Sequence, residues 1–199
     1  SGNLCADKKP AAINAVEGRG RTVTADVHVP RDVVEERFGV APEAVAEVNT
    51  RKNLVGSAKA GSLGFNAHAA NVVAAVFLAT GQDAAQVVEG SNCITTVEAR
   101  EGVRASDASA GTADESAGEL YASVNLASLE VGTVGGGTKL PTQAEALDVL
   151  GVRGGGDPAG SNADELAEVI AAGALAGELS LLAALASRHL SSAHEELGR

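Results

Sequence analysis

This 199-residue chain contains no tryptophan and no methionine, and aromatic residues make up only 2% of it. Lysine occurs five times, whereas aspartate and glutamate together occur 26 times, and the formal net charge is −11. Because nucleic-acid binders need cations for phosphates and rings for bases, this composition excludes that class. The two cysteines, Cys5 and Cys93, lack metal-ligand spacing, so we expect neither a disulfide framework nor a metal site.

Long hydrophobic runs are also missing, although apolar residues are plentiful. Hydrophobic residues reach 45%, with alanine at 39 positions, so the chain can bury a core and intrinsic disorder is excluded. Gly, Asn, Glu or Ser interrupt the Ala-rich stretches before 18 residues, and we therefore expect no membrane span. The low cysteine content fits a reducing cytoplasm, and we therefore expect a cytoplasmic protein.

The acidic excess, together with few lysines and small core side chains, favours a salt-rich cytoplasm. Salt screens the repulsion between carboxylates and strengthens the burial of apolar surface. The alternative is an ordinary acidic protein encoded by a GC-rich genome.

Hydrophobic periodicity predicts an α+β fold with mixed or antiparallel strands. The stretch at residues 65–80 is apolar nearly all round, so we expect it to form a long buried central helix flanked by the other elements. Residues 101–118 have little to bury and are predicted to form a mobile acidic loop. Strands are expected at residues 22–29, 93–98 and 119–130. Other helices are expected at residues 10–17, 31–38, 42–50, 143–150, 161–187 and 190–197.

Three charged residues oppose the electrostatics expected of their local structure. Lys8 and Lys9 precede the first helix, where the helix dipole is already positive. They indicate either an anionic or oxyanion partner or two solvated lysines. Asp83 follows the apolar helix, next to the negative end of its dipole, so it either pairs with a cation such as lysine or lies in a solvated turn.

Other polar features leave similar alternatives open. His68 and Asn71 share one face of the apolar helix, where they either present donors to a ligand or hydrogen-bond within the core. The Gly-rich segment at 132–138 lets backbone N–H groups approach a phosphate or a nicotinamide, but it matches no standard nucleotide fingerprint. His189 and His194 are too far apart on a helix to face one metal ion, so they are surface residues or include one proton donor.

Ordered motifs along the chain carry a family resemblance. They are SGNLCADKKPAAIN (1–14), EGRG (17–20), KNLVGS (52–57), NAHAAN (66–71), GQDAAQ (81–86), SNCIT (91–95), GTVGGGT (132–138) and AGELSLLAAL (176–185). With these motifs the chain resembles class I 3-hydroxy-3-methylglutaryl-coenzyme A (HMG-CoA) reductases, of the type found in halophilic archaea, nearly throughout except at 101–118. The resemblance implies reduction of a thioester to an alcohol in two hydride steps from NADPH, without a metal, giving mevalonate and free CoA.

The resemblance also implies roles for individual residues. Lys8 stabilises the developing oxyanion, Asp83 orients Lys8, and His194 protonates the departing CoA thiolate. His194 is matched by its spacing from His189, since its neighbours depart from the family's usual Ser-His-Met pattern. The implied substrate-binding residues are Ser1, Asp7, Lys9, Lys52, His68 and Asn71. The implied cofactor-binding residues, near the nicotinamide, are Gly135, Gly136, Gly137 and Thr138.

By the same resemblance, residues 1–199 form the C-terminal part of the substrate-binding and catalytic large domain, with residues 188–199 as a C-terminal tail. The family's catalytic glutamate and NADPH-binding small domain lie upstream of Ser1, so we expect the chain alone to be inactive. Family members are homodimers or higher oligomers with the active site at the interface. Two other functions remain open, namely a different CoA-ester enzyme and a non-catalytic, salt-adapted binding module.

Overall fold

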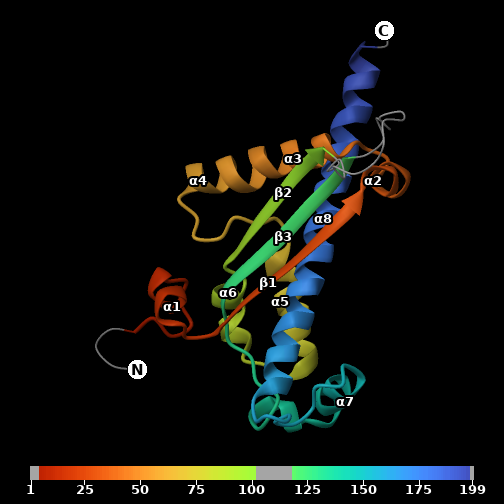
Figure 1. Cartoon of the computed structure of the whole chain (residues 1–199). Coiled ribbons are helices and arrows are strands. Elements are labelled where there is room, and N and C mark those ends of the chain that lie inside the picture. The colour runs from red at the N-terminus through yellow and green to blue at the C-terminus, as the bar shows by residue number, and fades with distance from the viewer. Residues whose placement is uncertain (1–4, 102–117, 198–199) are drawn as a thin grey trace, which may run out of the picture.

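A three-stranded antiparallel sheet forms the centre of the computed structural model, which describes residues 5–101 and 118–197 and the side chains up to residue 187. The strand order is β1-β3-β2, so the last strand in sequence lies in the middle. Figure 1 shows the sheet in front of the long helix α8. The bounds are β1 (Arg21–Pro30), β2 (Cys93–Glu101) and β3 (Gly118–Leu129). The α+β class expected from the sequence is confirmed.

Alternation along the strands separates a buried face from a more polar one. On β3, Leu120, Val124 and Leu126 are fully buried, whereas the intervening side chains are partly exposed. On the other face Tyr121 pairs in register with His28 of β1. Because side chains alternate with a period of two, this pairing register keeps the apolar set against the helices.

The helix α8 (Ser161–Leu197) is the long central helix of this fold. It packs against β1 and β3, with Leu166, Ile170 and Leu182 fully buried. The break expected between residues 187 and 190 is wrong, because α8 continues through them to Leu197. Neither glycine nor proline occurs between residues 178 and 197, so nothing in the chain interrupts the helix there.

Part of α8 also contradicts the expectation that every apolar stretch is short. Within the described residues, the segment Ser161–Ser187 is long and apolar enough to cross a membrane, and its most apolar window has a mean hydropathy of 2.0. Half of that window is buried inside the protein, where α8 packs against β1 and β3. Gly173 and Gly177 do not shorten the helix because they lie where neighbouring side chains pack closely.

The apolar stretch predicted as the buried central helix is shorter and less buried than expected. The helix α5 (Ala69–Thr80) begins four residues later because Phe65 forms a β-bridge with Ile94. Only one stripe of α5 is buried, including Val73 and Phe77, while Leu78 on the opposite side is 64% exposed. A helix that is apolar all round therefore presents an uncovered apolar face in this chain.

The remaining elements connect these layers. The predicted helix at 42–50 is longer than expected, because α3 continues through a π-helix, η1, into α4. Residues 102–117, which hold nearly all of the predicted mobile loop, lie outside the described residues, and their flanks Glu101 and Gly118 pair in the sheet. The other bounds are α1 (Ala12–Glu17), α2 (Arg31–Phe38), α3 (Pro42–Val48), η1 (Asn49–Gly56), α4 (Ser57–Ala60), η2 (Ala84–Gln86), α6 (Val87–Gly90), η3 (Gly136–Lys139) and α7 (Pro141–Val149).

Candidate functional site

Lys8 and Asp83 form an ion pair in which Lys8 Nζ lies 3.2 Å from Asp83 Oδ2. Both side chains are about half exposed, at 47% and 52%, so a ligand can reach the ammonium group. Lys8 has a backbone φ of +57°, a conformation that non-glycine residues seldom adopt. A turn closed by the Lys9 N–H to the Ala6 carbonyl, at 3.2 Å, holds the backbone there.

The local setting of Asp83 differs from the one inferred from sequence. Asp83 is the N-cap of the short helix η2, and its Oδ1 accepts the Ala85 N–H at 3.0 Å. This hydrogen bond, and secondarily the contact with Lys8, lowers the pKa of Asp83 below its ordinary value of 3.8. The carboxylate therefore belongs to a favourable N-cap rather than opposing the end of α5, which closes at Gly81.

Asp7 is held by two residues that the sequence analysis did not single out. Arg19 forms an ion pair with Asp7, and Gln86 Nε2 donates to Asp7 Oδ1 at 3.1 Å. Arg19 also approaches Glu130, with Nε 3.8 Å from Oε1. Both residues lie in motifs quoted for the resemblance, but nothing local separates them from ordinary surface residues. Lys9 Nζ extends to the Cys5 sulfur and to the Asp7 carbonyl, each at 3.3 Å.

The Asp7–Arg19 pair predicts a specific pH dependence of stability. The hydrogen bond from Arg19 lowers the pKa of Asp7 below 3.8. Its stabilisation is therefore fully present above the ordinary pKa and is lost as the pH falls through the lowered one. We expect the urea midpoint of the wild-type chain to exceed that of Arg19→Met by a constant amount above about pH 5, and the difference to shrink below pH 3.8.

Arg37→Met is the matched control, because Arg37 is 72% exposed in its contact with Glu36. Comparing each variant with the wild type removes the titration of carboxylates remote from Arg19, whereas Glu130, 3.8 Å from Arg19 Nε, stays in the difference. A wild-type advantage over Arg19→Met that is independent of pH would contradict the assignment.

The Gly-rich segment lies beside the C-terminal end of α5, next to Asp83. Gln82 pairs with Gly132 in both directions, donating to its carbonyl and accepting its N–H, each at 2.8 Å. The backbones of Gly81 and Gly137 also approach closely, since a Cβ on Gly137 would lie 2.6 Å from the Gly81 carbonyl oxygen. Thus Gly137 and Thr138 pack against α5, and Thr138 is buried.

Gly135 and Gly136 form the open part of this segment. They have φ values of +80° and +51°, and a Cβ at either position would meet nothing within 4 Å. The backbone of these two glycines therefore borders open space.

His68 and Asn71 form a second polar group at the opposite end of α5. Asn71 Nδ2 donates to His68 Nδ1 at 3.1 Å, and His68 is the residue immediately before the helix. His68 lies 12 residues and Asn71 nine residues before Thr80, the last residue of α5, so the helix separates them from its Asp83 end by about 18 Å and about 14 Å. The structure thus assembles the predicted site residues as two groups within one chain.

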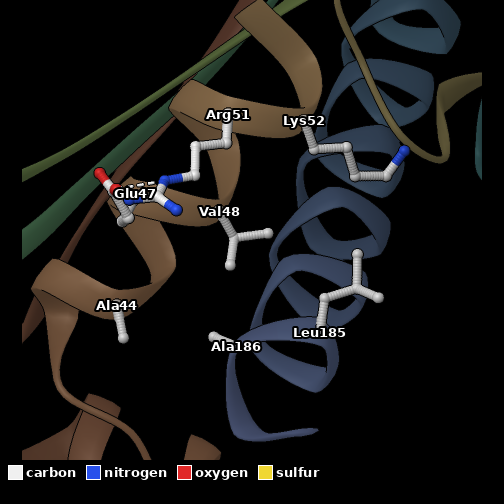
Figure 2. Close-up of a pocket in the computed structure, with 7 residues that line it drawn as sticks. All are labelled: Ala44, Glu47, Val48, Arg51, Lys52, Leu185 and Ala186. Carbon is white, nitrogen blue, oxygen red and sulfur yellow. Dashed lines mark hydrogen bonds and ion pairs between the residues drawn. The ribbon is translucent and has the colours of Figure 1, made fainter. Parts of the chain in front are cut away.

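Lys52 takes part in neither the Lys8–Asp83 ion pair nor the Asp7–Arg19 ion pair. It lies on the π-helix η1 and lines a pocket of about 530 Å³ between this helix and α8. Figure 2 shows its side chain extending past α8, whereas Arg51 folds back onto Glu47. Among the side chains that the structure describes, no hydrogen bond or ion pair joins Lys52 to Asp7, Lys8 or Asp83.

Two predicted site residues cannot be placed. Ser1 lies outside the described residues, and so does the side chain of His194 in the last turns of α8. Within the residues that are described, no group of three or more His, Cys, Asp or Glu side chains is arranged to hold a metal ion. The buried Glu178 of α8 contacts the start of α5, and the sequence analysis gave it no role beyond its motif.

Comparison with known proteins identifies the relatives of this chain. Residues 1–199 match the family model described as hydroxymethylglutaryl-coenzyme A reductase. The chain is 78% identical over 199 residues to 3-hydroxy-3-methylglutaryl-coenzyme A reductase of Halobacterium salinarum and 75% identical to that of Haloferax volcanii. It is 56% identical over the same length to the reductase of Pyrococcus abyssi. Each match covers all of this chain and 45% of the relative, so the chain spans less than half of its relatives' length.

Proposed function

Because this chain belongs to the hydroxymethylglutaryl-coenzyme A reductase family, we propose that it contributes to the reduction of HMG-CoA to mevalonate and CoA by NADPH. The observation that carries the proposal is the Lys8–Asp83 ion pair at 3.2 Å, beside an open Gly-rich loop. An accessible ammonium group next to a loop that admits a flat ring suits hydride transfer to a carbonyl. The family match over residues 1–199 gives the substrate class.

Lys8 provides positive charge where the reaction develops negative charge. When hydride adds to the thioester carbonyl, its oxygen becomes an oxyanion, and a nearby ammonium stabilises that charge more than it stabilises the neutral carbonyl. Asp83 is itself oriented by the Ala85 N–H, so it holds the Lys8 ammonium in a defined direction. Asp83 is thus the residue that orients Lys8 in this proposal.

The Gly-rich loop accepts the cofactor end at which reduction occurs. NADPH, when bound, supplies the hydride. Gly135 and Gly136 leave the backbone open to the nicotinamide ring, while Gly137 and Thr138 anchor the loop to α5. The relatives are more than twice as long as this chain, and we propose that their additional length supplies the NADPH-binding small domain and the catalytic glutamate.

The substrate-binding residues complete the site. Asp7 and Lys9 lie next to Lys8 in the same turn, where they face the hydroxyl and carboxylate of the hydroxymethylglutaryl group in this proposal. We also retain Ser1 in substrate binding and His194 as the proton donor to the CoA thiolate. These two roles are carried by the family match alone.

Lys52, His68 and Asn71 reach the same substrate in this proposal only from a second copy of the chain. Along α5, His68 lies about 18 Å and Asn71 about 14 Å from the end that precedes Asp83. The uncovered apolar face of α5, with Leu78 64% exposed, provides surface for such a contact. We therefore propose a homodimer, in the cytoplasm, with its active site at the interface.

The decisive experiment measures NADPH oxidation by the protein at the full length of its relatives, with HMG-CoA, in low and multimolar salt. We expect oxidation that depends on the thioester and yields mevalonate, and none from the 199-residue chain alone. Turnover by the 199-residue chain would contradict the proposed division of the site. Acyl-CoA turnover without NADPH would indicate a different CoA-ester enzyme. The absence of any turnover at full length would favour a binding module.

A further inference from the structure

Glu178 is a fully buried carboxylate on the central helix α8, with an exposed fraction of 0%. A buried charge is costly unless hydrogen bonds satisfy it, so its surroundings indicate what it does. All of the hydrogen bonds that the structure gives it come from neutral donors, which are backbone N–H groups, an amide and a hydroxyl.

One oxygen of Glu178 binds the start of α5. Its Oε1 accepts the consecutive backbone N–H groups of Ala67, at 2.9 Å, of His68, and of Ala69, at 3.0 Å. The first N–H groups of a helix have no partner within the helix and form its positive end. Glu178 therefore acts as an N-cap for α5 that is supplied by another helix, and it fixes the backbone of His68 directly.

The other oxygen binds two further elements. Glu178 Oε2 accepts Asn53 Nδ2 at 3.3 Å and the Thr95 hydroxyl at 2.9 Å. Asn53 lies on the π-helix η1 and directly follows Lys52, and Thr95 lies on β2. A single carboxylate thus joins α8 to η1, which carries Lys52, and to α5, which carries Asn71.

Gly177, the residue before Glu178, determines where the His68 ring lies. A Cβ on Gly177 would lie 2.7 Å from His68 Cδ2, so the imidazole packs directly on the backbone of α8. Because Asn71 Nδ2 donates to His68 Nδ1, the neutral ring carries its proton on Nε2. The ring therefore has a fixed position and offers a donor at Nε2.

We propose that Glu178 is a positioning residue for binding of the acyl substrate. It holds His68 and Asn71 in place through the start of α5, and it holds Lys52 in place through Asn53. This inference rests on the proposed function, in which those three residues contact HMG-CoA. Glu178 binds the start of α5, whereas Asp83 and the Gly-rich loop lie at its far end. Its removal consequently weakens substrate binding without disturbing the cofactor loop or the Lys8–Asp83 pair.

The test is Glu178→Gln in the full-length protein, with Glu168→Gln as the matched control, because Glu168 is exposed on the same helix. Glutamine retains one acceptor oxygen but directs an NH₂ group toward another donor, Asn53 Nδ2. We expect the KM for HMG-CoA to rise about tenfold, with kcat and the KM for NADPH changed less than about twofold. An unchanged KM for HMG-CoA, or an equal rise in both KM values, would overturn the proposal.

A second variant and a spectroscopic measurement keep the inference testable if Glu178→Gln does not fold. Gly177→Ala retains the carboxylate but displaces the His68 ring, and it should produce the same selective rise in the KM for HMG-CoA. In ¹⁵N-histidine NMR spectra, His68 should show the Nε2–H tautomer in the wild type, and Glu178→Gln or Gly177→Ala should alter that signal. An unaltered signal in a folded variant would refute positioning, even if the wild-type protein fails to reduce HMG-CoA and the proposed function itself is wrong.

Discussion

Replacing Lys8 with methionine in the full-length protein is expected to lower kcat for HMG-CoA reduction by about 10² to 10³-fold. Methionine retains much of the side-chain length but removes the charge that stabilises the oxyanion. Because that charge acts mainly in the transition state, we expect kcat and kcat/KM to fall together, with little change in KM. Steady-state kinetics with HMG-CoA as the varied substrate would measure both parameters.

Lys59→Met is the control for the Lys8 variant, since Lys59 is exposed on α4 and lies outside the proposed site. It should leave both parameters within about twofold of the wild type. A Lys8→Met enzyme that retains more than about a tenth of the wild-type kcat would exclude the proposed electrostatic role.

Mixing two inactive variants is expected to restore activity, because the proposed site takes Lys8 from one chain and Asn71 from another. In a heterodimer of Lys8→Met and Asn71→Ala chains, one site carries both substitutions and the other carries neither. Random assembly of equal amounts makes half of the dimers heterodimers, so about a quarter of the wild-type activity should return. Activity would be measured after co-expression, at HMG-CoA concentrations well below KM.

The control for this mixing experiment is one chain that carries both substitutions, co-expressed with wild-type chains. Under the shared-site arrangement, both sites of each such heterodimer contain one substituted residue, so only wild-type homodimers remain active. If mixing the two single variants restores nothing although heterodimers form, Lys8 and Asn71 act within one chain, and the proposed interface is wrong.

Local patterns predicted most elements of the fold from the sequence. The helix α2 has the bounds that were expected, because Pro30 precedes it and Gly39 ends it with a φ of +69°. The three strands were found because the side chains on one face of each are more buried than those on the other. The central helix was assigned wrongly, since an apolar composition does not show which faces of α5 are covered within this chain.

The candidate site was predicted unevenly for a similar reason. Charge alone suggested that Asp83 pairs with a lysine, and the structure has Lys8 there at 3.2 Å. The dipole argument for Asp83 failed, because a new helical turn begins at this residue and its carboxylate accepts a hydrogen bond from the Ala85 N–H of that turn. Arg19 and Glu178 received no role, since their partners Asp7 and His68 lie 12 and 110 positions away.

The sequence by itself determined the family, the α+β class and the acidic character of this protein. These properties follow from ordered motifs, local periodicity and residue counts, which need no three-dimensional contacts to be read. Only the tertiary structure decided that α8 is the central helix and that α5 separates two groups of site residues. It also showed that Glu178 joins His68 to the helix bearing Lys52. Those facts depend on hydrogen bonds and packing between segments remote in sequence, and no local pattern encodes such contacts.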